Sequence, residues 1–254
     1  MIMKKTLNSR YEYLSDFADS LPAGGFEQGG EVLHDGRNTV KLFEVDGRKI
    51  VVKRFRVPHL FNRIMYTFFR GTKARRAFEN ARLLQEKYGI GTPAAIGFLD
   101  VKRGPLVGHS YLITEYTGYK PIRDLLREEK YLQVMGTNAL VSFIVDLHDK
   151  GIRHKDLNNT NVVYRLDKNL QFDFQLIDIN RMSFGPMSRR ACIANLTRIC
   201  DETRLIVHIS QKYAEHRGWD RNYSLGLLAF YRGKYENKKK RSAYLKSLLG
   251  LKAA

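Results

Sequence analysis

The sequence predicts an α+β fold of two lobes, because strand-type patterns fill its first part and helix-type patterns its second. Before residue 116, short runs rich in β-branched residues alternate with turn-forming residues, and one segment has apolar side chains at helical spacing. After residue 116 most of the apolar spacing is helical. We therefore expect a small antiparallel-sheet N-lobe with one main helix at residues 1–116 and a mostly helical C-lobe at residues 117–254.

The N-lobe is expected to contain a three-stranded antiparallel meander. Its strands are Glu31–His34, Val40–Val45 and Lys49–Phe55, all rich in β-branched or aromatic residues. Turn-forming residues 35–38 join the first two strands. Asp46-Gly47 joins the second to the third, since Asp-Gly favours tight hairpin turns.

One main helix and a second strand pair complete the predicted N-lobe. The helix covers residues 73–88, where one stripe of apolar side chains consists of Ala74, Ala77, Phe78, Ala81 and Leu84. Gly89 is a natural helix stop. Strands at residues 95–101 and 109–116 bracket a turn at residues 102–105.

The C-lobe is expected to be built mainly from helices. A short one covers residues 122–129, a longer one residues 136–150, and several more follow residue 187. Two short strands, at residues 161–164 and 174–179, interrupt them.

The composition limits the class of protein. The chain has 44 Lys and Arg against 26 Asp and Glu, a net charge of +18, so polyanionic partners are favoured. Cys192 and Cys200 cannot form a disulfide framework and lack metal-binding spacing, which favours a reducing compartment. No secretion signal is evident, and no uncharged run approaches the roughly 20 residues of a spanning helix.

Two segments of the C-lobe carry the densest group of chemically active residues. His154–Asn161 reads H-K-D-L-N-N-T-N, and Leu176–Asp178 ends an apolar strand with an acidic residue. The pattern resembles the catalytic loop of the protein-kinase-like superfamily, H-x-D-L-x-x-x-N, with its metal-binding Asp on a strand downstream. The resemblance implies a bilobal protein-kinase-like fold. Taken singly, an H-K-D sequence is common in surface loops, and an Asp after a strand is more often a turn former.

The resemblance assigns roles to these residues. Asp156 would accept a hydrogen bond from a substrate hydroxyl group and take its proton, while His154 would brace the loop. Asn161 and Asp178 offer hard oxygen ligands, which suit Mg²⁺ bridging the phosphates of ATP. The implied cofactors are ATP and Mg²⁺.

The front half offers matching elements for the phosphates. Lys53, in Val51-Val52-Lys53, resembles the strand lysine that holds the α- and β-phosphates. Its partner would be Glu79 on the following helix, with Glu86 as a less suitable alternative close to the helix stop. A solvent-facing lysine and a solvated glutamate are the alternative interpretations.

Two further nucleotide contacts are expected from the same resemblance. The turn that contains Gly36 and Arg37 would cover the phosphates, although it has one glycine where protein kinases have three, and a plain hairpin turn is equally compatible. Glu115 and Tyr116 resemble the hinge that hydrogen-bonds adenine through its backbone.

Three departures argue against a protein acceptor. Asp178 is followed by Ile-Asn instead of Phe-Gly, Asn158 replaces the catalytic-loop lysine, and no A-P-E element follows. The strings D-L-N-x-x-N at residues 156–161 and L-I-D-x-x-R at residues 176–181 resemble the lipopolysaccharide kinases of the Kdo and heptose (WaaP, InaA-like) type. Over roughly residues 31–200, this resemblance implies phosphorylation of an inner-core sugar, Kdo or heptose, at the cytoplasmic membrane face.

Partners follow from the same resemblance and from the charge. A glycolipid or sugar substrate is expected, and the aromatic and basic insert at residues 58–70 is compatible with an anionic membrane surface. So is the basic tail, whose residues are Lys238, Lys239, Lys240, Arg241, Tyr244, Leu245, Leu248 and Leu249. No nucleic-acid-binding signature is present, so a nucleic-acid partner is not expected. Another small-molecule kinase, a protein kinase and a catalytically silent kinase-like scaffold remain alternatives.

Overall fold

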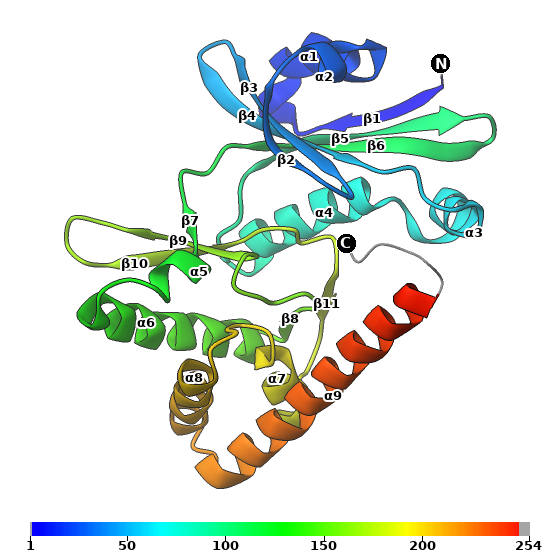
Figure 1. Ribbon diagram of the computed structural model, residues 1–254. Coiled ribbons are helices and arrows are strands. Elements are labelled where there is room, and N and C mark those ends of the chain that lie inside the picture. The colour runs from blue at the N-terminus through cyan, green and yellow to red at the C-terminus, as the bar shows by residue number, and fades with distance from the viewer. Residues whose placement is uncertain (1, 249–254) are drawn as a thin grey trace. The chain divides into compact units, whose positions relative to one another are not determined.

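The computed structural model describes residues 2–248 and contains two compact units (Figure 1). The first unit comprises the chain up to Gly118 together with Gln175–Arg181, and the second comprises Tyr119–Phe174 and the chain from Met182 onward. Of the basic tail discussed above, Leu249 lies outside the described residues. The division at Gly118 is close to the expected one, but the return of residues 175–181 to the first unit was not anticipated.

The first unit is built on an antiparallel sheet of six strands in the order β1-β5-β6-β4-β3-β2. The strands are β1 (Met3–Leu7), β2 (Glu31–Asp35), β3 (Thr39–Val45), β4 (Arg48–Phe55), β5 (Ala95–Arg103) and β6 (Leu106–Glu115). The expected meander is β2-β3-β4, and β5 and β6 are the expected second pair. Asp46 and Gly47 both have positive φ in the β3–β4 turn, as a tight hairpin of Asp-Gly requires.

Helices cover both faces of this sheet, with α1 and α2 above it and α4 beneath it in Figure 1. They are η1 (Ser9–Leu14), α1 (Ser15–Ser20), η2 (Leu21–Ala23), α2 (Gly25–Gln28), α3 (Leu60–Met65), η3 (Tyr66–Arg70), α4 (Lys73–Arg82) and η4 (Leu83–Lys87). Helix α4 buries the expected stripe, and Phe78 packs on Phe98 of β5 with ring centroids 5.5 Å apart. Thr72 caps α4 by accepting a hydrogen bond from Arg75 N.

The N-terminal segment supplies part of the core of the first unit. Buried apolar side chains from η1 to α2 pack against the sheet; they are Leu14, Ala18, Leu21 and Phe26. Buried Lys41 of β3 fixes this segment, since its ammonium group donates to the carbonyls of Phe26, Glu27 and Gly29 at 2.7, 3.1 and 2.9 Å. These bonds satisfy a charge that would otherwise be costly to bury.

The second unit is mainly helical, as expected. Its helices are α5 (Ile122–Leu125), α6 (Lys130–Asp149), α7 (Arg189–Leu196), α8 (Thr203–His216) and α9 (Arg221–Leu248). Its strands are β7 (Lys120–Pro121), β8 (Ile152–His154), β9 (Val162–Leu166), β10 (Phe172–Leu176) and β11 (Met182–Phe184). They form a sheet in the order β10-β9-β7 and a separate β8–β11 pair.

The α+β prediction is confirmed, and the differences lie in particular elements. The structure adds β1, the helices of residues 9–28, and the α3–η3 segment to the N-lobe, which therefore has more than one helix. Helix α6 begins at Lys130, six residues before the expected start at Gly136. None of the helices in residues 2–248 is long and apolar enough to cross a lipid bilayer.

Candidate active site

Lys53 and Asp178 form an ion pair in the first unit. Lys53 lies on β4, and its Nζ is 2.6 Å from Oδ1 of Asp178, which is 125 residues away in the sequence. Their side chains are 19% and 33% exposed, so the pair is half-buried and still open to a ligand. The same oxygen accepts a hydrogen bond of 2.6 Å from Nδ2 of Asn180. The structure thus brings together two residues that the sequence predicted for phosphate and metal binding.

The segment that carries Asp178 is held on the first unit by three hydrogen bonds. Leu176 N donates to Gly91 O at 2.9 Å, and Thr92 Oγ1 donates to Leu176 O at 2.7 Å. Nδ2 of Asn80, on α4, donates to Ile179 O at 2.7 Å. Asp178 itself has a φ of 53°, a left-handed conformation that Asp tolerates better than most residues and that is often found at functional sites.

Glu79 lies in a different environment from the one predicted. Its carboxylate pairs with Arg75 at 2.7 Å, one turn earlier on α4, and its side chain is 52% exposed. Among the ion pairs of residues 2–248 there is none between Glu79 and Lys53. The α4 residue that reaches the Asp178 loop is instead its neighbour Asn80, which sequence reasoning missed because no local pattern distinguishes it. The predicted role of Glu79 stays a prediction.

Lys53 and Lys73 place positive charge close to Asp178 within the first unit. Burial lowers the pKa of Lys73, the nearby charge of Arg37 lowers it further, and Asp178 acts in the opposite direction. Arg181 contributes a further positive charge close to Lys73. Positive groups gathered around one carboxylate suit a polyanionic ligand such as a triphosphate.

The turn with Gly36 and Arg37 is an exposed hairpin between β2 and β3. Thr39 Oγ1 donates to Oδ1 of Asp35 at 3.2 Å, and a Cβ at Gly36 would come within 2.7 Å of Nε2 of His34. Arg37 lies near enough to Lys73 to affect its pKa. The hairpin and the charge of Arg37 agree with either interpretation of this turn, so its contact with phosphate stays a prediction.

The expected hinge residues lie at the end of β6. Glu115 N donates to Ala94 O at 2.9 Å, and Tyr116 N donates to Lys49 O at 3.0 Å. Both N–H groups are therefore bonded within the protein, so an adenine contact at these residues would use a carbonyl. Tyr11 OH, on η1, donates to Oε1 of Glu115 at 3.0 Å and holds that side chain.

In the second unit, one tight loop carries Asp156 and Asn161. Asp156 N donates to Nδ1 of buried His154 at 3.1 Å, so His154 braces the loop. Oδ1 of Asn158 accepts hydrogen bonds from the backbone N–H groups of Thr160 and Asn161 at 2.9 and 3.0 Å. The residue in the place of the kinase lysine therefore shapes the loop.

Two glycines set the start of this loop. Gly151 ends α6 with a φ of 69°, and a Cβ there would come within 2.6 Å of the carbonyl oxygen of Gly185. Gly185 N in turn donates to Gly151 O at 2.9 Å. Only glycine allows this close approach. It brings the chain after β11 against the chain before β8.

Arg198 forms an ion pair with Asp156. The guanidinium group of Arg198 also lies 5.2 Å from the ring centroid of Tyr235 on α9, which helps to fix its position. The side chain of Asp156 is 22% exposed, so it remains accessible. Sequence reasoning missed Arg198, because it lies 42 residues beyond Asp156, in the turn after α7, with no motif of its own.

A series of buried hydrogen bonds supports the loop that carries Asp156, through the carbonyl of His154. Tyr213 OH and Nδ1 of His148 are 2.8 Å apart, and Nε2 of His148 and Oδ1 of Asn195 are 3.1 Å apart. Asn195 then donates to His154 O at 2.9 Å. Burial lowers the pKa of His148 to about 4, with the charges of Arg217 and Arg153 adding to the effect. The histidine is therefore neutral, accepting from Tyr213 and donating to Asn195.

The buried hydrogen bonds of neutral His148 predict that acid destabilises the protein. Because the pKa of His148 falls from 6.5 in the unfolded chain to about 4 in the folded one, the unfolded state binds the proton first. The full stability is present above pH 6.5, and roughly 3 kcal/mol is lost as the pH falls to about 4. Denaturant unfolding of a His148→Gln variant should show a weaker loss over this range. His216→Gln, which changes an exposed histidine on α8, should keep the wild-type pH dependence; equal slopes for all three proteins would contradict the assignment.

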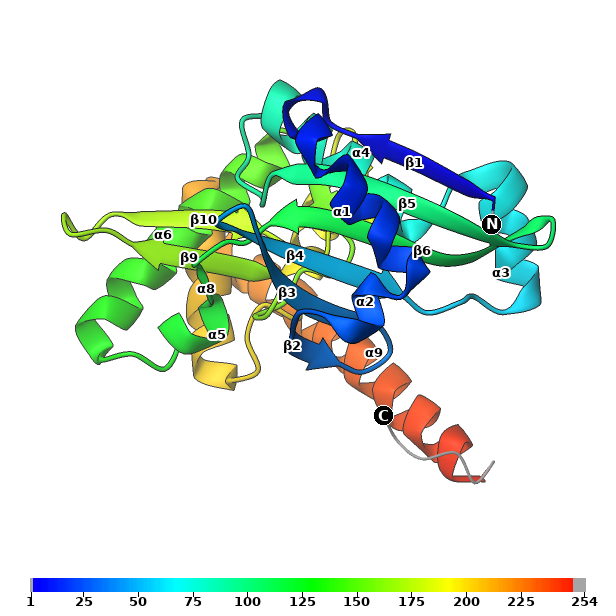
Figure 2. The same cartoon turned by 90° about the horizontal axis from the view of Figure 1, so that it is seen from above.

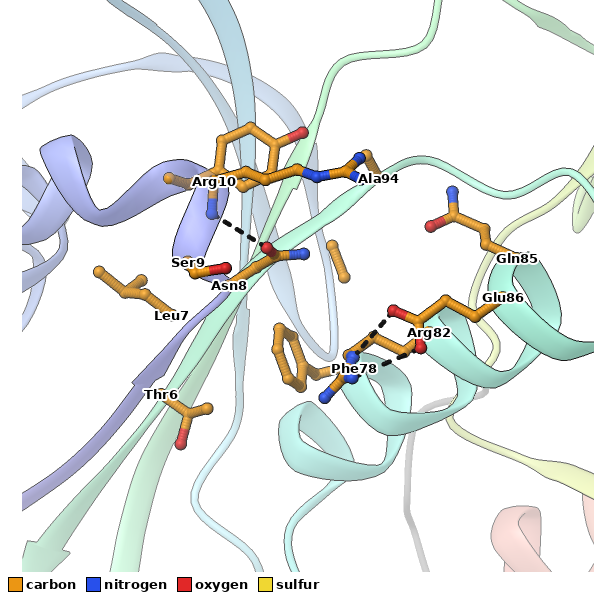
Figure 3. A pocket seen from close by; sticks show the side chains of 12 residues that line it. Thr6, Leu7, Asn8, Ser9, Arg10, Phe78, Arg82, Gln85, Glu86 and Ala94 are labelled. Atoms are coloured by element: carbon orange, nitrogen blue, oxygen red, sulfur yellow. Dashed lines mark hydrogen bonds and ion pairs between the residues drawn. The ribbon is translucent and has the colours of Figure 1, made fainter.

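A separate pocket of about 710 Å³ opens elsewhere in the first unit (Figure 3). Its lining comes from the chain after β1, from α4 and η4, and from the start of β5; polar members include Asn8, Arg10, Arg82 and Glu86. Arg82 pairs with Glu86 at 3.2 Å across one turn. Among the described residues, the pocket is lined by none of those predicted to contact phosphate, metal or adenine directly. Its lining does include Glu86, the less suitable alternative partner of Lys53, and Tyr11, which donates to Glu115.

The fold is of the protein-kinase-like class. The model of the Lipopolysaccharide kinase (Kdo/WaaP) family matches residues 30–215, and the chain belongs to that family. The prediction from the sequence motifs is confirmed at this level. The family is one of kinases.

A solved structure shares the fold of this chain. A structure of WaaP in complex with acyl carrier protein is similar with a TM-score of 0.62 and 20% identity, over 92% of this chain and 98% of that one. A Stt7 homolog from Micromonas algae soaked with ATP has a TM-score of 0.44 and 14% identity, over 63% of this chain and 55% of that one. No curated protein matches the chain in sequence.

Proposed function

We propose that this chain transfers the γ-phosphate of ATP to a hydroxyl group of Kdo or heptose in the inner core of lipopolysaccharide. The observation that carries the proposal is the ion pair of Lys53 and Asp178, 2.6 Å apart, within a chain of a kinase family. A lysine beside a carboxylate, in a basic environment, suits an ATP phosphate group with its counterion. The reaction would take place at the cytoplasmic face of the inner membrane.

A magnesium ion at this site would need only a few ligands from the protein. Nδ2 of Asn161 donates to Asp156 O at 2.9 Å, which leaves Oδ1 as the amide atom that can bind a cation. In residues 2–248 no three His, Cys, Asp or Glu side chains gather as a metal site. Asp178 and Asn161, together with phosphate oxygens, would hold Mg²⁺, which commonly uses few protein ligands. The ion would neutralise charge on the transferred phosphate.

The chain's own residues would do the rest of the work. Asp156 would accept a hydrogen bond from the acceptor hydroxyl group and take its proton. Arg198 would hold the Asp156 carboxylate in position through their ion pair. Lys53 would hold the α- and β-phosphates. Glu79 remains its predicted partner. The other predicted nucleotide contacts are to the phosphates, from Gly36 and Arg37, and to adenine, from Glu115 and Tyr116.

A sugar acceptor is supported by the loop and by the family. Asn158 shapes the loop through its amide oxygen and supplies no charge, unlike the lysine of protein-phosphorylating relatives. The family that the chain belongs to is described as one of lipopolysaccharide kinases. The choice between Kdo and heptose is left to the assay.

The test is transfer of labelled γ-phosphate to glycolipids of defined core structure. Purified protein is incubated with ATP, Mg²⁺ and either Kdo-lipid A or an extracted core that also contains heptose, with and without acyl carrier protein, since the related structure contains one. We expect label in one glycolipid and none when Asp156→Ala replaces the wild type. Label in protein alone would contradict the acceptor class, and no label in any mixture would favour the silent scaffold.

A further inference from the structure

An exposed aromatic ridge projects from the first unit. Helix α3 and its continuation η3 lie beside the β5–β6 turn at one end of the sheet (Figures 1 and 2). Five large apolar side chains on this segment face solvent, and we call them the aromatic ridge: Leu60, Phe61, Ile64, Phe68 and Phe69, with exposed fractions of 63, 74, 40, 65 and 75%. Leu60, Ile64 and Phe68 recur every four residues, so they share one side of the helix.

The other side of the same helix is anchored to the sheet. Nε and Nη2 of Arg63 donate to the carbonyls of Val107 and Arg103 at 2.8 and 2.9 Å. Thr67 Oγ1 accepts a hydrogen bond of 3.0 Å from Val107 N. These bonds fix the rotation of the helix, so the outward direction of the ridge is built into the fold.

The exposure of the ridge is energetically unfavourable in water. Transfer of a Leu, Ile or Phe side chain from water to an apolar environment is favourable, and the ridge forgoes most of this gain. A contiguous apolar patch on an otherwise polar surface usually marks a binding surface. The polar contacts of Arg63 and Thr67 are made on the anchored side of the helix. A ligand of the ridge would therefore contact it mainly through apolar groups.

Positive charge surrounds the ridge. Residues 47–78 contain no Asp or Glu, and Arg56 and Arg70, at the two ends of the segment, are exposed. Lys102 and Arg103 in the adjacent β5–β6 turn are exposed as well. Aromatic side chains flanked by arginine and lysine are typical of segments that enter the headgroup region of an anionic bilayer.

We propose that the aromatic ridge inserts into the surface of an anionic lipid bilayer, with the surrounding basic residues against the headgroups. A bilayer is favoured over a protein partner because the ridge is a projecting helix on which Asn62 is the one exposed polar residue between Leu60 and Phe69. A fluid apolar medium accepts such a shape without a complementary groove. The inference does not rest on the proposed function, since binding to vesicles needs neither ATP nor an acceptor.

Co-sedimentation of the full chain with vesicles tests this proposal. We expect binding to vesicles of phosphatidylcholine with phosphatidylglycerol, and much weaker binding to phosphatidylcholine alone. Phe61→Ser combined with Phe68→Ser should lower the partition coefficient at least about tenfold. Tyr131→Ser with Val134→Ser, which removes two exposed apolar side chains from α6, is the matched control and should bind like the wild type.

A second variant separates the charge from the apolar contact. Arg56→Gln with Arg70→Gln keeps the ridge and should weaken binding to the anionic vesicles and reduce its salt dependence. If thermal unfolding shows that the double Phe variant is not folded, the double Arg variant still tests whether this surface binds anionic vesicles.

Three results would overturn the proposal. The first is failure of the wild type to bind anionic vesicles, and the second is an equal loss of binding in the α6 control. The third is a wild-type dimer that dissociates only in the Phe variant, because a second copy of the chain would then cover the ridge. Loss of vesicle binding with normal phosphorylation of detergent-dispersed glycolipid would support the ridge's role apart from the proposed reaction.

Discussion

Replacing Asp156 with Asn is expected to lower the rate of phosphoryl transfer by about 10²–10⁴-fold while the protein stays folded. The amide keeps the size of the carboxylate, and the loop is held by the backbone of Asp156 through its bonds to His154 and Asn161. What is lost is the negative acceptor that takes the proton of the attacking hydroxyl group. Initial rates of phosphate transfer at saturating ATP measure the effect directly.

The matched control for this variant is Asp146→Asn. Asp146 lies on α6, pairs with Lys150 at 2.7 Å and is 48% exposed. The Asp146→Asn variant should retain the wild-type rate, because an exposed ion pair between neighbouring turns contributes little to the stability of the fold. An Asp156→Asn protein with an unchanged rate and an unchanged thermal unfolding curve would remove Asp156 from the reaction.

Asp178→Asn is expected to reduce the rate by about 10²–10³-fold and to raise the Mg²⁺ concentration needed for half-maximal activity. The substitution removes the charge that pairs with Lys53 and that would bind the ion. Asn accepts left-handed backbone as readily as Asp, so the φ of 53° should persist. A titration of the rate against Mg²⁺ distinguishes lost metal affinity from a general loss of activity.

Asp46→Asn serves as the control for the backbone. Asp46 also has a left-handed φ, of 50°, but it lies in the β3–β4 turn and carries no predicted role. Its variant should show the wild-type rate and the wild-type dependence on Mg²⁺. If Asp178→Asn responds to Mg²⁺ in the same way as the wild type, Asp178 is not a metal ligand.

Local patterns in the sequence predicted the central elements well. The β-branched run of Lys49–Phe55 became β4, and the apolar stripe of residues 73–88 became α4 and η4, because each buries one side against a neighbour. The segment of residues 9–28 was not predicted. Its helices are short, and their burial depends on contacts with the sheet and on Lys41. The local spacing of apolar residues does not predict such contacts.

The site was predictable only where a motif spans it. Asp156, Asn161 and Asp178 were singled out by their spacing, and Lys53 by its strand, and the structure pairs Lys53 with Asp178. Arg198 and Asn80 act over 42 and 99 residues, respectively, to reach Asp156 and Ile179. Contacts of that range arise from the tertiary fold, so a single sequence gives no signal for them.

The contribution of the N-terminal segment to the core limits how the chain can be divided. The family match begins at residue 30, yet β1 pairs with β5, and Leu14, Leu21 and Phe26 pack on Ile50 and Val52 of the sheet. A protein trimmed to the matched region would expose the edge of β5 and one face of the sheet to water. Residues 2–29 therefore belong to the same folding unit as the strand that carries Lys53, and domain boundaries for expression should be drawn ahead of them.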